Sequence, residues 1–366
     1  LHSKEIRDLF RNSRLIGRRF RLAHVRFGRE VIEVATFRAG HEGNEDGASI
    51  ADTGRILRDN VYGDIDDDVW RRDFTVNALY YNISDFSIVD YVGGVEDIRQ
   101  RQLRLIGDPA LRYREDPVRM LRAIRFATKL ELHIDDATRE AFNRYGDLLN
   151  GIAPARLFDE SLKLFHSGSG LETFQALRDF HLFKHLFPLA EKSFVDDDIA
   201  YNLTVEALRN TDQRLAESKS VNPAFIFAAI LWGAMTSRRA RLVADGVHQS
   251  EAFRLAADEA VAEQVKNVAI PRRFTTIARE IWFFQPRLAK RTRKHAERLV
   301  EHARFRAAYD FLLLRVEAGE PLAELGDWWT KFQQVEGTAR EEMLADLSVP
   351  SRNRRRPRTR RKSPID

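Results

Sequence analysis

The sequence predicts an α+β protein in which all strands lie near the N-terminus, ahead of a long all-α part and a disordered basic tail. Three observations support this prediction. Apolar residues alternate between Leu15 and Ile106, helical periodicity replaces the alternation from Tyr113 to about Leu347, and Val349–Asp366 holds eight Lys and Arg residues against one acid. Such a basic run cannot bury apolar area, so we expect it to contact nucleic acid or to act only as a solubility tail.

Length and composition bound the class of protein. A chain of 366 residues with 43% hydrophobic residues can form two or three domains with sizeable cores. It has no cysteine, which excludes disulfides, thiolate zinc sites and a cysteine nucleophile and suits a cytoplasmic protein. The longest apolar run, Pro223–Met235, is too short to span a bilayer.

The N-terminal region has the pattern of a short helix and a small sheet. Ser3–Phe10 is typical of a helix, Gly28 suits a hairpin turn, and strands are predicted at Leu15–Phe20, Leu22–Phe27 and Val31–Phe37. Alternation places Glu33 on the face opposite Ile32, where it either decorates an edge or serves a ligand. The acidic, glycine-rich stretch Ala39–Gly54 indicates a mobile loop.

The next segment, Trp70–Leu79, reads WRRDFTVNAL and is unusually rich in polar residues for a buried pattern, which suggests a ligand site. Taken alone, Asp73 could instead pair with Arg72 or cap a helix. A strand pair is predicted over Tyr80–Tyr91, followed by the Gly93-Gly94 turn, a short helix and a last strand at Leu103–Ile106.

The central helix is predicted in Tyr113–Lys129, with Pro117 at its first position and Asp116 as its cap. Its buried seam is formed by Val118, Leu121, Ile124 and Ala127. Arg119, Arg122 and Arg125 repeat at the same spacing with no acid between them, so they would repel each other unless an anion such as polyphosphate or RNA neutralised them. Local capping and pairing is the alternative for this motif.

The remainder is predicted to be helical, with breaks at Gly151–Pro154, Ser167–Gly170, Ser218–Pro223, Gly246, Pro271 and Gly319–Pro321. Basic runs at Pro271–Arg273 and Lys290–Lys294 lie close in sequence to Phe274, Trp282, Phe283 and Phe284. Such residues either grip single-stranded nucleic acid or form ordinary helix surface over an aromatic core.

Three motifs occur in the order RRDFTVNAL (Arg71–Leu79), DYVGGVEDI (Asp90–Ile98) and REDPVRMLRAIRFA (Arg114–Ala127). Together they resemble the bacterial class II nucleotidyltransferases, which comprise tRNA CCA-adding enzymes and poly(A) polymerases. Three further features are similar to the polymerase branch: LIGRRFRLAHV with IEVATFR (Leu15–Arg38), PARLFDESLKLF (Pro154–Phe165) and the basic tail. The resemblance implies a palm-like mixed sheet in the head and a helical neck, body and leg.

The resemblance also assigns site residues. It implies that Asp73 is an active-site aspartate near the nucleotide sugar and that Arg72 contacts the nucleotide. Asp116 and Arg119 match the pair that reads the base edge, since a carboxylate accepts from the adenine amino group and an arginine donates to ring nitrogens. Arg122 and Arg125 match positions that hold the triphosphate or the primer.

The family's first motif is a glycine turn followed by an Asp-x-Asp pair that binds the catalytic metals. By order along the chain it should precede Leu1, so the expected Mg²⁺ ligands lie upstream and no metal ligand is assigned in this sequence. Asp64-Ile65-Asp66 has the right spacing but falls in an acidic loop where the family has no catalytic residue. Glu33 ranks below Asp73 as a residue that lines the metal site.

The resemblance predicts Mg²⁺-dependent transfer of AMP from ATP to RNA 3′ ends, that is, mRNA polyadenylation that promotes decay, by a cytoplasmic monomer. The expected divisions are a head at 1–107 lacking its first part, a neck at 108–187, an RNA-binding body and leg at 188–347 and the tail at 348–366. A tRNA CCA-adding enzyme and a non-catalytic RNA-binding relative are the alternatives.

Overall fold

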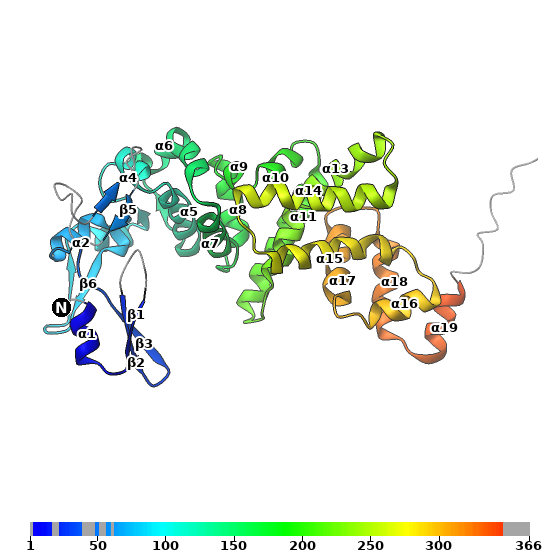
Figure 1. Cartoon of the computed structure of the whole chain (residues 1–366), viewed down its shortest axis with the longest axis horizontal. Coiled ribbons are helices and arrows are strands. Elements are labelled where there is room, and N and C mark those ends of the chain that lie inside the picture. The colour runs from blue at the N-terminus through cyan, green and yellow to red at the C-terminus, as the bar shows by residue number, and fades with distance from the viewer. Residues whose placement is uncertain (1–2, 17–21, 39–47, 51–55, 60–61, 347–366) are drawn as a thin grey trace, which may run out of the picture. The chain divides into compact units, whose positions relative to one another are not determined.

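The computed structural model describes residues 3–16, 22–38, 48–50, 56–59 and 62–346. Within these residues every strand lies before Asp135 and the rest of the regular structure is helical (Figure 1). The expected α+β class is confirmed, and the helices break at all six predicted places. The arginine-rich tail and most of the predicted loop at Ala39–Gly54 lie outside the described residues.

The chain forms two compact units. The first contains Leu1–Asp196, Leu208–Pro223 and Glu259–Pro271, and the second contains Asp197–Ala207, Ala224–Asp258 and Arg272–Asp366. The helices α11 (Asp198–Ala216) and α14 (Gln249–Asn267) therefore contribute residues to both units.

The first unit begins with a helix and a three-stranded antiparallel sheet in the order β1-β2-β3. The elements are α1 (Ser3–Leu9), β1 (Ser13–Ile16), β2 (Leu22–Phe27) and β3 (Glu30–Val34). Ile6 packs with Ala23 and Val25 in a small core. Glu33 pairs across the sheet with His24, on the face opposite this core, as the alternation predicted. Its Oε1 lies 3.0 Å from Nε2 of His24.

An acidic helix follows the hairpin of β4 (Ala48–Ile50) and β5 (Ile56–Asp59). This helix, α2 (Ile65–Arg71), starts with a capping box in which Asp64 accepts from the Asp67 backbone amide at 2.9 Å and Asp67 accepts from the Asp64 amide. The prediction of a loop here was wrong, because the two carboxylates satisfy free amides at a helix start. Asp64 and Asp66 are thus the cap and first turn of a helix.

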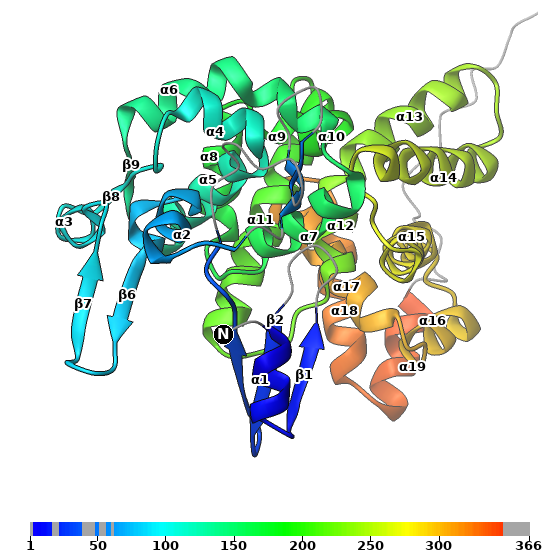
Figure 2. The same ribbon diagram turned by 60° about the vertical axis from the view of Figure 1, so that its left-hand side comes forward.

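The second sheet region contains the predicted hairpin, formed by β6 (Leu79–Asn82) and β7 (Ser87–Asp90) (Figure 2). It lies between η1 (Thr75–Asn77) and α3 (Gly94–Arg99) in the chain. The last predicted strand is shorter than expected, since β8 covers only Gln102–Leu103. It pairs in parallel with β9 (His133–Ile134), a strand beyond the central helix that was missed because two residues show no alternation.

The central helix is interrupted near its predicted start. The segment forms α4 (Pro109–Glu115) and α5 (Val118–Leu130), separated by Asp116 and Pro117. A residue that precedes proline disfavours the helical conformation, which explains the break at Asp116. Pro117 is therefore the cap of α5 and not its first residue, and Asp116 Oδ1 accepts from the Val118 amide at 3.3 Å. The predicted seam of Val118, Leu121, Ile124 and Ala127 is buried.

The other helices follow in chain order. Those of the first unit are α6 (Asp136–Tyr145), η2 (Gly146–Gly151), α7 (Pro154–Phe165), α8 (Gly170–Asp179), α9 (Phe183–Leu186) and α10 (Pro188–Ser193). The later ones are α12 (Pro223–Ile230), α13 (Trp232–Ala244), α15 (Arg272–Leu288), α16 (Arg293–Val300), α17 (Phe305–Glu317), α18 (Ala323–Gln334) and α19 (Gly337–Asp346).

Aromatic side chains form the core of the second unit. The indole of Trp282 donates to the Ala228 carbonyl and that of Trp329 donates to the Leu288 carbonyl, both at 3.0 Å. Trp282 and Phe284 are buried, so these aromatics of the predicted basic patch are core residues and not stacking platforms. In the part of the chain that the structure describes, no helix is both long and apolar enough to cross a membrane.

Candidate active site

Asp73 lies where α2 has ended and η1 begins, and it joins two of the sequence motifs. Its Oδ1 accepts hydrogen bonds from the Phe74 amide at 3.0 Å and from Asn77 Nδ2 at 3.1 Å. Its Oδ2 accepts from Arg122 Nε at 2.6 Å. The structure therefore brings Asp73 and Arg122 together, although 49 positions separate them in the sequence. This contact holds the central helix α5 against the segment RRDFTVNAL.

Arg72 contacts the carboxylate of Asp68 and not that of Asp73, its neighbour in the sequence. Its Nη2 donates to Asp68 Oδ2 at 3.0 Å and its Nε donates to the Tyr80 hydroxyl at 3.2 Å. The Tyr80 hydroxyl donates to Asp68 at 2.8 Å, and burial together with this bond raises the pKa of Tyr80 to about 12. Arg72 is thus held in place by Asp68 and Tyr80, and the simple Arg72–Asp73 pair considered above is not what the structure shows.

Arg112 and Arg119 share one carboxylate. Arg112 Nη1 donates to Glu115 Oε2 at 2.6 Å, and Arg119 Nη1 donates to the same oxygen at 2.8 Å. Arg112 Nη2 also donates to the backbone oxygen of Arg72 at 2.6 Å, which ties α4 to the end of α2. Burial and the nearby Arg119 lower the pKa of Arg112 to about 10, so it stays charged at neutral pH. This cluster has more positive than negative charge and favours an anion.

Two of the three arginines of α5 have neutralising carboxylates, so the prediction that all three need an external anion was wrong. Glu115 neutralises Arg119 and Asp73 neutralises Arg122. Arg125 is different: its Nε is buried with no hydrogen-bond partner, and its guanidinium carbon lies 4.3 Å from the ring centroid of Phe126. Burial and the neighbouring Arg122 lower the pKa of Arg125. Helical spacing does not indicate the contact with Glu115, because Glu115 ends α4 and Arg119 lies in α5, beyond the break at Asp116 and Pro117.

Asp116 and Arg119 do not pair with each other. Asp116 Oδ2 accepts from Arg156 Nη2 at 2.6 Å, so a residue at the start of α7 holds this carboxylate. Arg156 belongs to the segment PARLFDESLKLF, whose sequence resembles the polymerase branch. That resemblance did not indicate a contact with Asp116. Arg112, Glu115 and Arg156 are accordingly the site residues that sequence reasoning missed.

The described residues do not fit a divalent metal ion. Within them, no three His, Asp or Glu side chains group in a way that could hold a metal. Asp64 is engaged as a helix cap, and Glu33 contacts His24 and is largely exposed. Both oxygens of Asp73 are already bonded to Arg122, Phe74 and Asn77. What the arrangement offers is guanidinium groups for an anion and carboxylates that hold them in place.

Family models cover most of the chain. Residues 2–104 match the "Poly A polymerase head domain", 131–194 match the "Probable RNA and SrmB- binding site of polymerase A", and 245–363 match the "Polymerase A arginine-rich C-terminus". The last match includes the arginine-rich tail.

Curated relatives point the same way. The chain is 47% identical to poly(A) polymerase I of Salmonella typhimurium over 98% of its own length and 79% of the relative's. It is 44% identical to the Haemophilus influenzae poly(A) polymerase I, covering 98% and 82% of the two chains. A CCA-adding enzyme of Lactobacillus helveticus is 32% identical over only 50% of this chain and 43% of its own.

Among solved structures, the Bacillus stearothermophilus CCA-adding enzyme in complex with CTP has a TM-score of 0.58 at 22% identity, covering 91% of this chain and 72% of its own. This likeness shows a shared nucleotidyltransferase fold. The relatives that are similar over nearly the whole chain are poly(A) polymerases, and the CCA-adding enzymes are more distant. The chain therefore belongs to the poly(A) polymerase I family of bacterial class II nucleotidyltransferases.

Proposed function

We propose that this protein is a template-independent poly(A) polymerase that transfers AMP from ATP to RNA 3′ ends. The observation that carries the proposal is the contact between Asp73 and Arg122, which assembles the motif RRDFTVNAL and the helix α5 into one arginine-rich site. The near full-length similarity to poly(A) polymerases supports the choice of ATP and of RNA over the CCA-adding alternative.

The base of ATP would meet Asp116 and Arg119. Arg119 Nη1 donates hydrogen bonds to Glu115 and to the Arg112 carbonyl. A guanidinium has further N–H donors, which could contact the base. Asp116 is bonded to Arg156 through one oxygen, and its lone pairs can still accept from an amino group. Glu115 would therefore orient Arg119, and Arg156 would orient Asp116. The hydrogen-bonding groups that read the base would then be in place before the nucleotide binds.

The phosphates would meet Arg122 and Arg125. Arg122 is aimed by Asp73, while Arg125 has an Nε with no hydrogen-bond partner and a pKa lowered by burial and by Arg122. A polyphosphate would relieve this repulsion and accept the vacant donors. Asp73 itself acts here by positioning Arg122 beside the nucleotide, and Arg72 would contact the nucleotide from the end of α2.

Mg²⁺ is proposed as the cofactor, because phosphoryl transfer needs charge neutralisation at the phosphates. The described residues supply no ligand set for it, so no step is assigned to the metal in this site. The protein is proposed to act as a monomer on mRNA in the cytoplasm, where tails would promote decay. The head at 1–107, neck at 108–187, body and leg at 188–347 and tail at 348–366 remain the proposed functional divisions.

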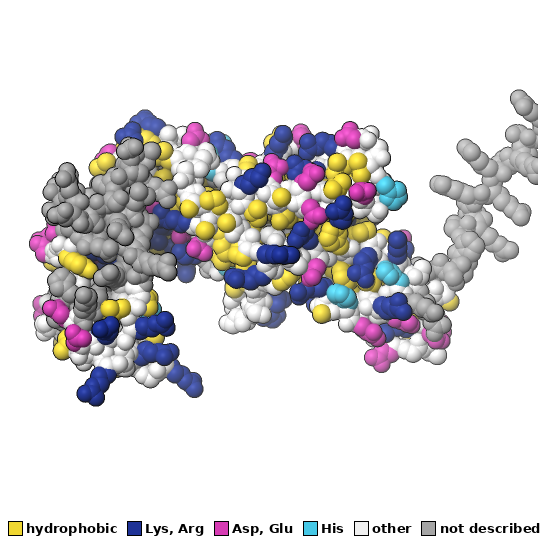
Figure 3. Space-filling model, in the orientation of Figure 1, with side chains coloured by type: hydrophobic (Ala, Val, Ile, Leu, Met, Phe, Trp, Pro, Cys, Tyr) yellow, Lys and Arg dark blue, Asp and Glu magenta, His cyan; other side chains and the backbone are white. Residues whose placement is uncertain are grey.

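RNA would be held through charge spread over several elements. Lys and Arg side chains on the visible face of the helical part alternate with acidic ones (Figure 3). In the predicted basic runs, Arg272 and Arg273 are exposed at the start of α15, whereas Arg291 pairs with Glu324 at 3.1 Å. Moderate attraction over a broad surface suits a polymerase that must release and re-engage its product.

Single-nucleotide extension tests the proposal. The full-length protein is given a short unstructured RNA, Mg²⁺ and one nucleotide at a time, and the products are resolved by length. We expect a long ladder with ATP and little or no extension with CTP, GTP or UTP. Extension of a tRNA that lacks its terminal CCA by CTP would support the CCA-adding alternative, and no extension with any nucleotide would support a non-catalytic relative.

A further inference from the structure

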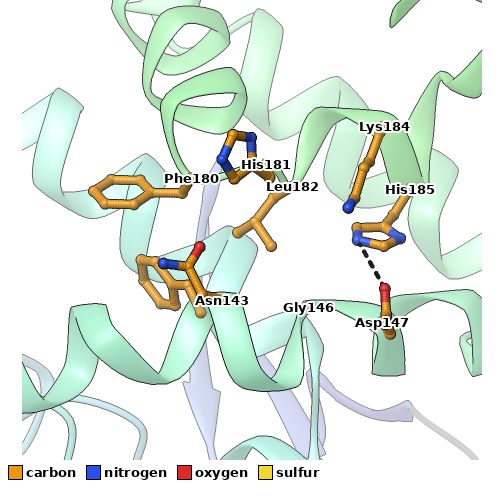
Figure 4. A pocket seen from close by; sticks show the side chains of 9 residues that line it. Asn143, Gly146, Asp147, Phe180, His181, Leu182, Lys184 and His185 are labelled. Carbon is orange, nitrogen blue, oxygen red and sulfur yellow. Dashed lines mark ion pairs between the residues drawn. The ribbon is translucent and has the colours of Figure 1, made fainter. Parts of the chain in front are cut away.

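A cavity of about 280 Å³ lies in the first unit (Figure 4). It is lined by the end of α6, by the start of η2 and by the segment that joins α8 to α9, none of which contains an arginine of the candidate active site. The figure shows Phe180, His181 and Leu182 along one side, with Asn143 facing them and His185 and Asp147 at the other end. The volume is at the lower limit for small-molecule sites and suits a single ring system. None of these residues has a role in the mechanism above.

The walls of the cavity are fixed by packing. Phe142 is fully buried and contacts Phe180 edge to face, with ring centroids 5.2 Å apart. Gly146 lets η2 approach the opposite wall, because a Cβ there would lie 3.0 Å from Leu182 Cδ2 and 3.5 Å from His185 Nε2. A preformed cavity binds without the cost of ordering its walls.

One end of the cavity carries two hydrogen-bond acceptors side by side. His185 Nδ1 lies 3.1 Å from Asn150 Oδ1, so the ring carries its proton on Nδ1 and donates it to that oxygen. Burial, reinforced by Lys184, lowers the pKa of His185, which keeps the ring neutral at pH 7. Its Nε2 is then an acceptor, and it lies 3.6 Å from Asp147 Oδ1. Asp147 is exposed while His185 is buried, so a donor group that enters this end of the cavity can be shared by the two acceptors.

The opposite side offers ring surfaces, and a cation lies beside His185 (Figure 4). His181 is exposed and has a φ of 57°. Its backbone amide donates a hydrogen bond to the Arg178 carbonyl at 2.9 Å, and the Leu182 amide donates to the Leu177 carbonyl at 2.7 Å, which hold this conformation. Aromatic and imidazole rings are the usual partners of unstacked RNA bases. Lys184 also lines the cavity and is exposed, so it can meet a phosphate.

We propose that this cavity binds one unstacked nucleobase of the RNA substrate, with the exocyclic amino group of adenine or cytosine placed between His185 and Asp147. The base would lie against Phe180 and His181. The proposal rests on the proposed function for the presence of RNA, and it adds a base-selective site remote from the nucleotide site. Uracil presents a carbonyl in place of the amino group, so it would be disfavoured by the two acceptors.

The test compares binding of oligo(A) and oligo(U) in the absence of ATP, by fluorescence anisotropy at one salt concentration. Asp147→Asn replaces an acceptor with an amide, and His181→Gly removes the ring while suiting the positive φ. Asp136→Asn is the matched control, since it removes one negative charge from an exposed position on α6. Thermal unfolding of each variant confirms that it is folded.

We expect Asp147→Asn to lower the ratio of oligo(A) to oligo(U) affinity by about five- to tenfold, the size of one lost base contact. His181→Gly should weaken the binding of both oligonucleotides, because stacking does not depend on the base, and the control should leave both affinities unchanged. Oligo(A) with purine in place of adenine, which lacks the amino group, should bind the unchanged protein like oligo(U). An unchanged ratio in Asp147→Asn, or unchanged affinity for both oligonucleotides in His181→Gly, overturns the proposal. AMP transfer to saturating RNA, measured in parallel, reports on the proposed function separately.

Discussion

At the residue scale, the site depends on carboxylates that aim arginines. Asp73 is only 12% exposed and its Oδ2 lies 2.5 Å from Arg122 Nη2, while Glu115 lies between Arg112 and Arg119. Short contacts of this kind between charged groups fix a guanidinium in one orientation. The positions of the phosphates and base of ATP would thus be set by residues that need not contact the nucleotide themselves.

Asp73→Asn is expected to lower kcat for AMP transfer by about a hundredfold, because Arg122 loses the charge that orients it and small misplacements of a binding group are costly. The measurement is steady-state extension of an RNA primer with ATP. Asp85→Asn, at an exposed turn between β6 and β7, removes the same charge and should leave kcat unchanged. Equal activity of the two variants would remove Asp73 from the site.

Arg119→Lys is expected to weaken discrimination between ATP and the other nucleotides, since a base-edge contact contributes about 1–3 kcal/mol. Lysine keeps the charge beside Glu115 but lacks the planar set of donors. Ratios of kcat/KM for ATP and GTP measure the effect. Arg101→Lys, in an exposed pair with Glu131, is the control. Unchanged nucleotide ratios in Arg119→Lys would assign Arg119 to structure alone.

The candidate site residues can be proposed from the sequence, but not all of their partners can. Asp73, Asp116 and the arginines of α5 stand out because their motifs are contiguous, whereas Asp73–Arg122 and Asp116–Arg156 join positions 49 and 40 apart. Such contacts are set by how helices pack, which spacing along one segment does not record. Glu115 and Arg119 are close in sequence, but the break between α4 and α5 separates them, so their contact also depends on how the two helices meet.

At the element scale, a glycine allows the motif RRDFTVNAL to pack closely against the motif DYVGGVEDI. The Gly94 position in α3 faces η1 so closely that a Cβ would lie 2.3 Å from the Thr75 carbonyl oxygen. Gly93 has a φ of 82° and open space around its Cβ position. The Gly-Gly pair therefore serves two purposes, a left-handed turn and a close helix packing, where the sequence indicated only a turn.

Gly94→Ala is expected to lower the free energy of unfolding by about 1–3 kcal/mol, because the added methyl group must displace backbone. Gly93→Asn is the matched variant, since asparagine tolerates a left-handed conformation and meets no atom there. Urea unfolding followed by circular dichroism compares the two. A Gly94→Ala protein as stable as the unchanged one would show that α3 does not pack on η1 this closely.

Elements with strong local signals were predicted well. The hairpin β6–β7 and the helix breaks follow from alternation and from Gly and Pro, which act through the backbone of their own segment. The strand pair β8–β9 was missed because its register depends on the packing of α5 between the two strands in the chain. The acidic start of α2 was assigned to a loop, since a capping box becomes visible only when its helix is recognised.

At the scale of the whole molecule, the charge is unevenly distributed along the chain. The chain carries a net charge of +5, and Ser351–Asp366 contains eight cations and one acid. RNA binding that depends on such cations releases counterions and weakens with salt.

Removing Ser351–Asp366 is expected to lower RNA affinity and to flatten its dependence on salt, while ATP binding stays the same. Affinities for one oligonucleotide at several salt concentrations give the slope, and nucleotide titration gives the control. Identical slopes with and without these residues would make them a solubility extension only.

The central claim, that this protein polymerises adenylate, is tested most directly by letting both nucleotides compete on one substrate. The full-length protein receives equimolar ATP and CTP with a tRNA that ends just before its CCA sequence, and the products are read by 3′-end sequencing. For a poly(A) polymerase we expect runs of A that are added directly to the tRNA end and extend without a fixed stop. Products that end uniformly after C-C-A would contradict it.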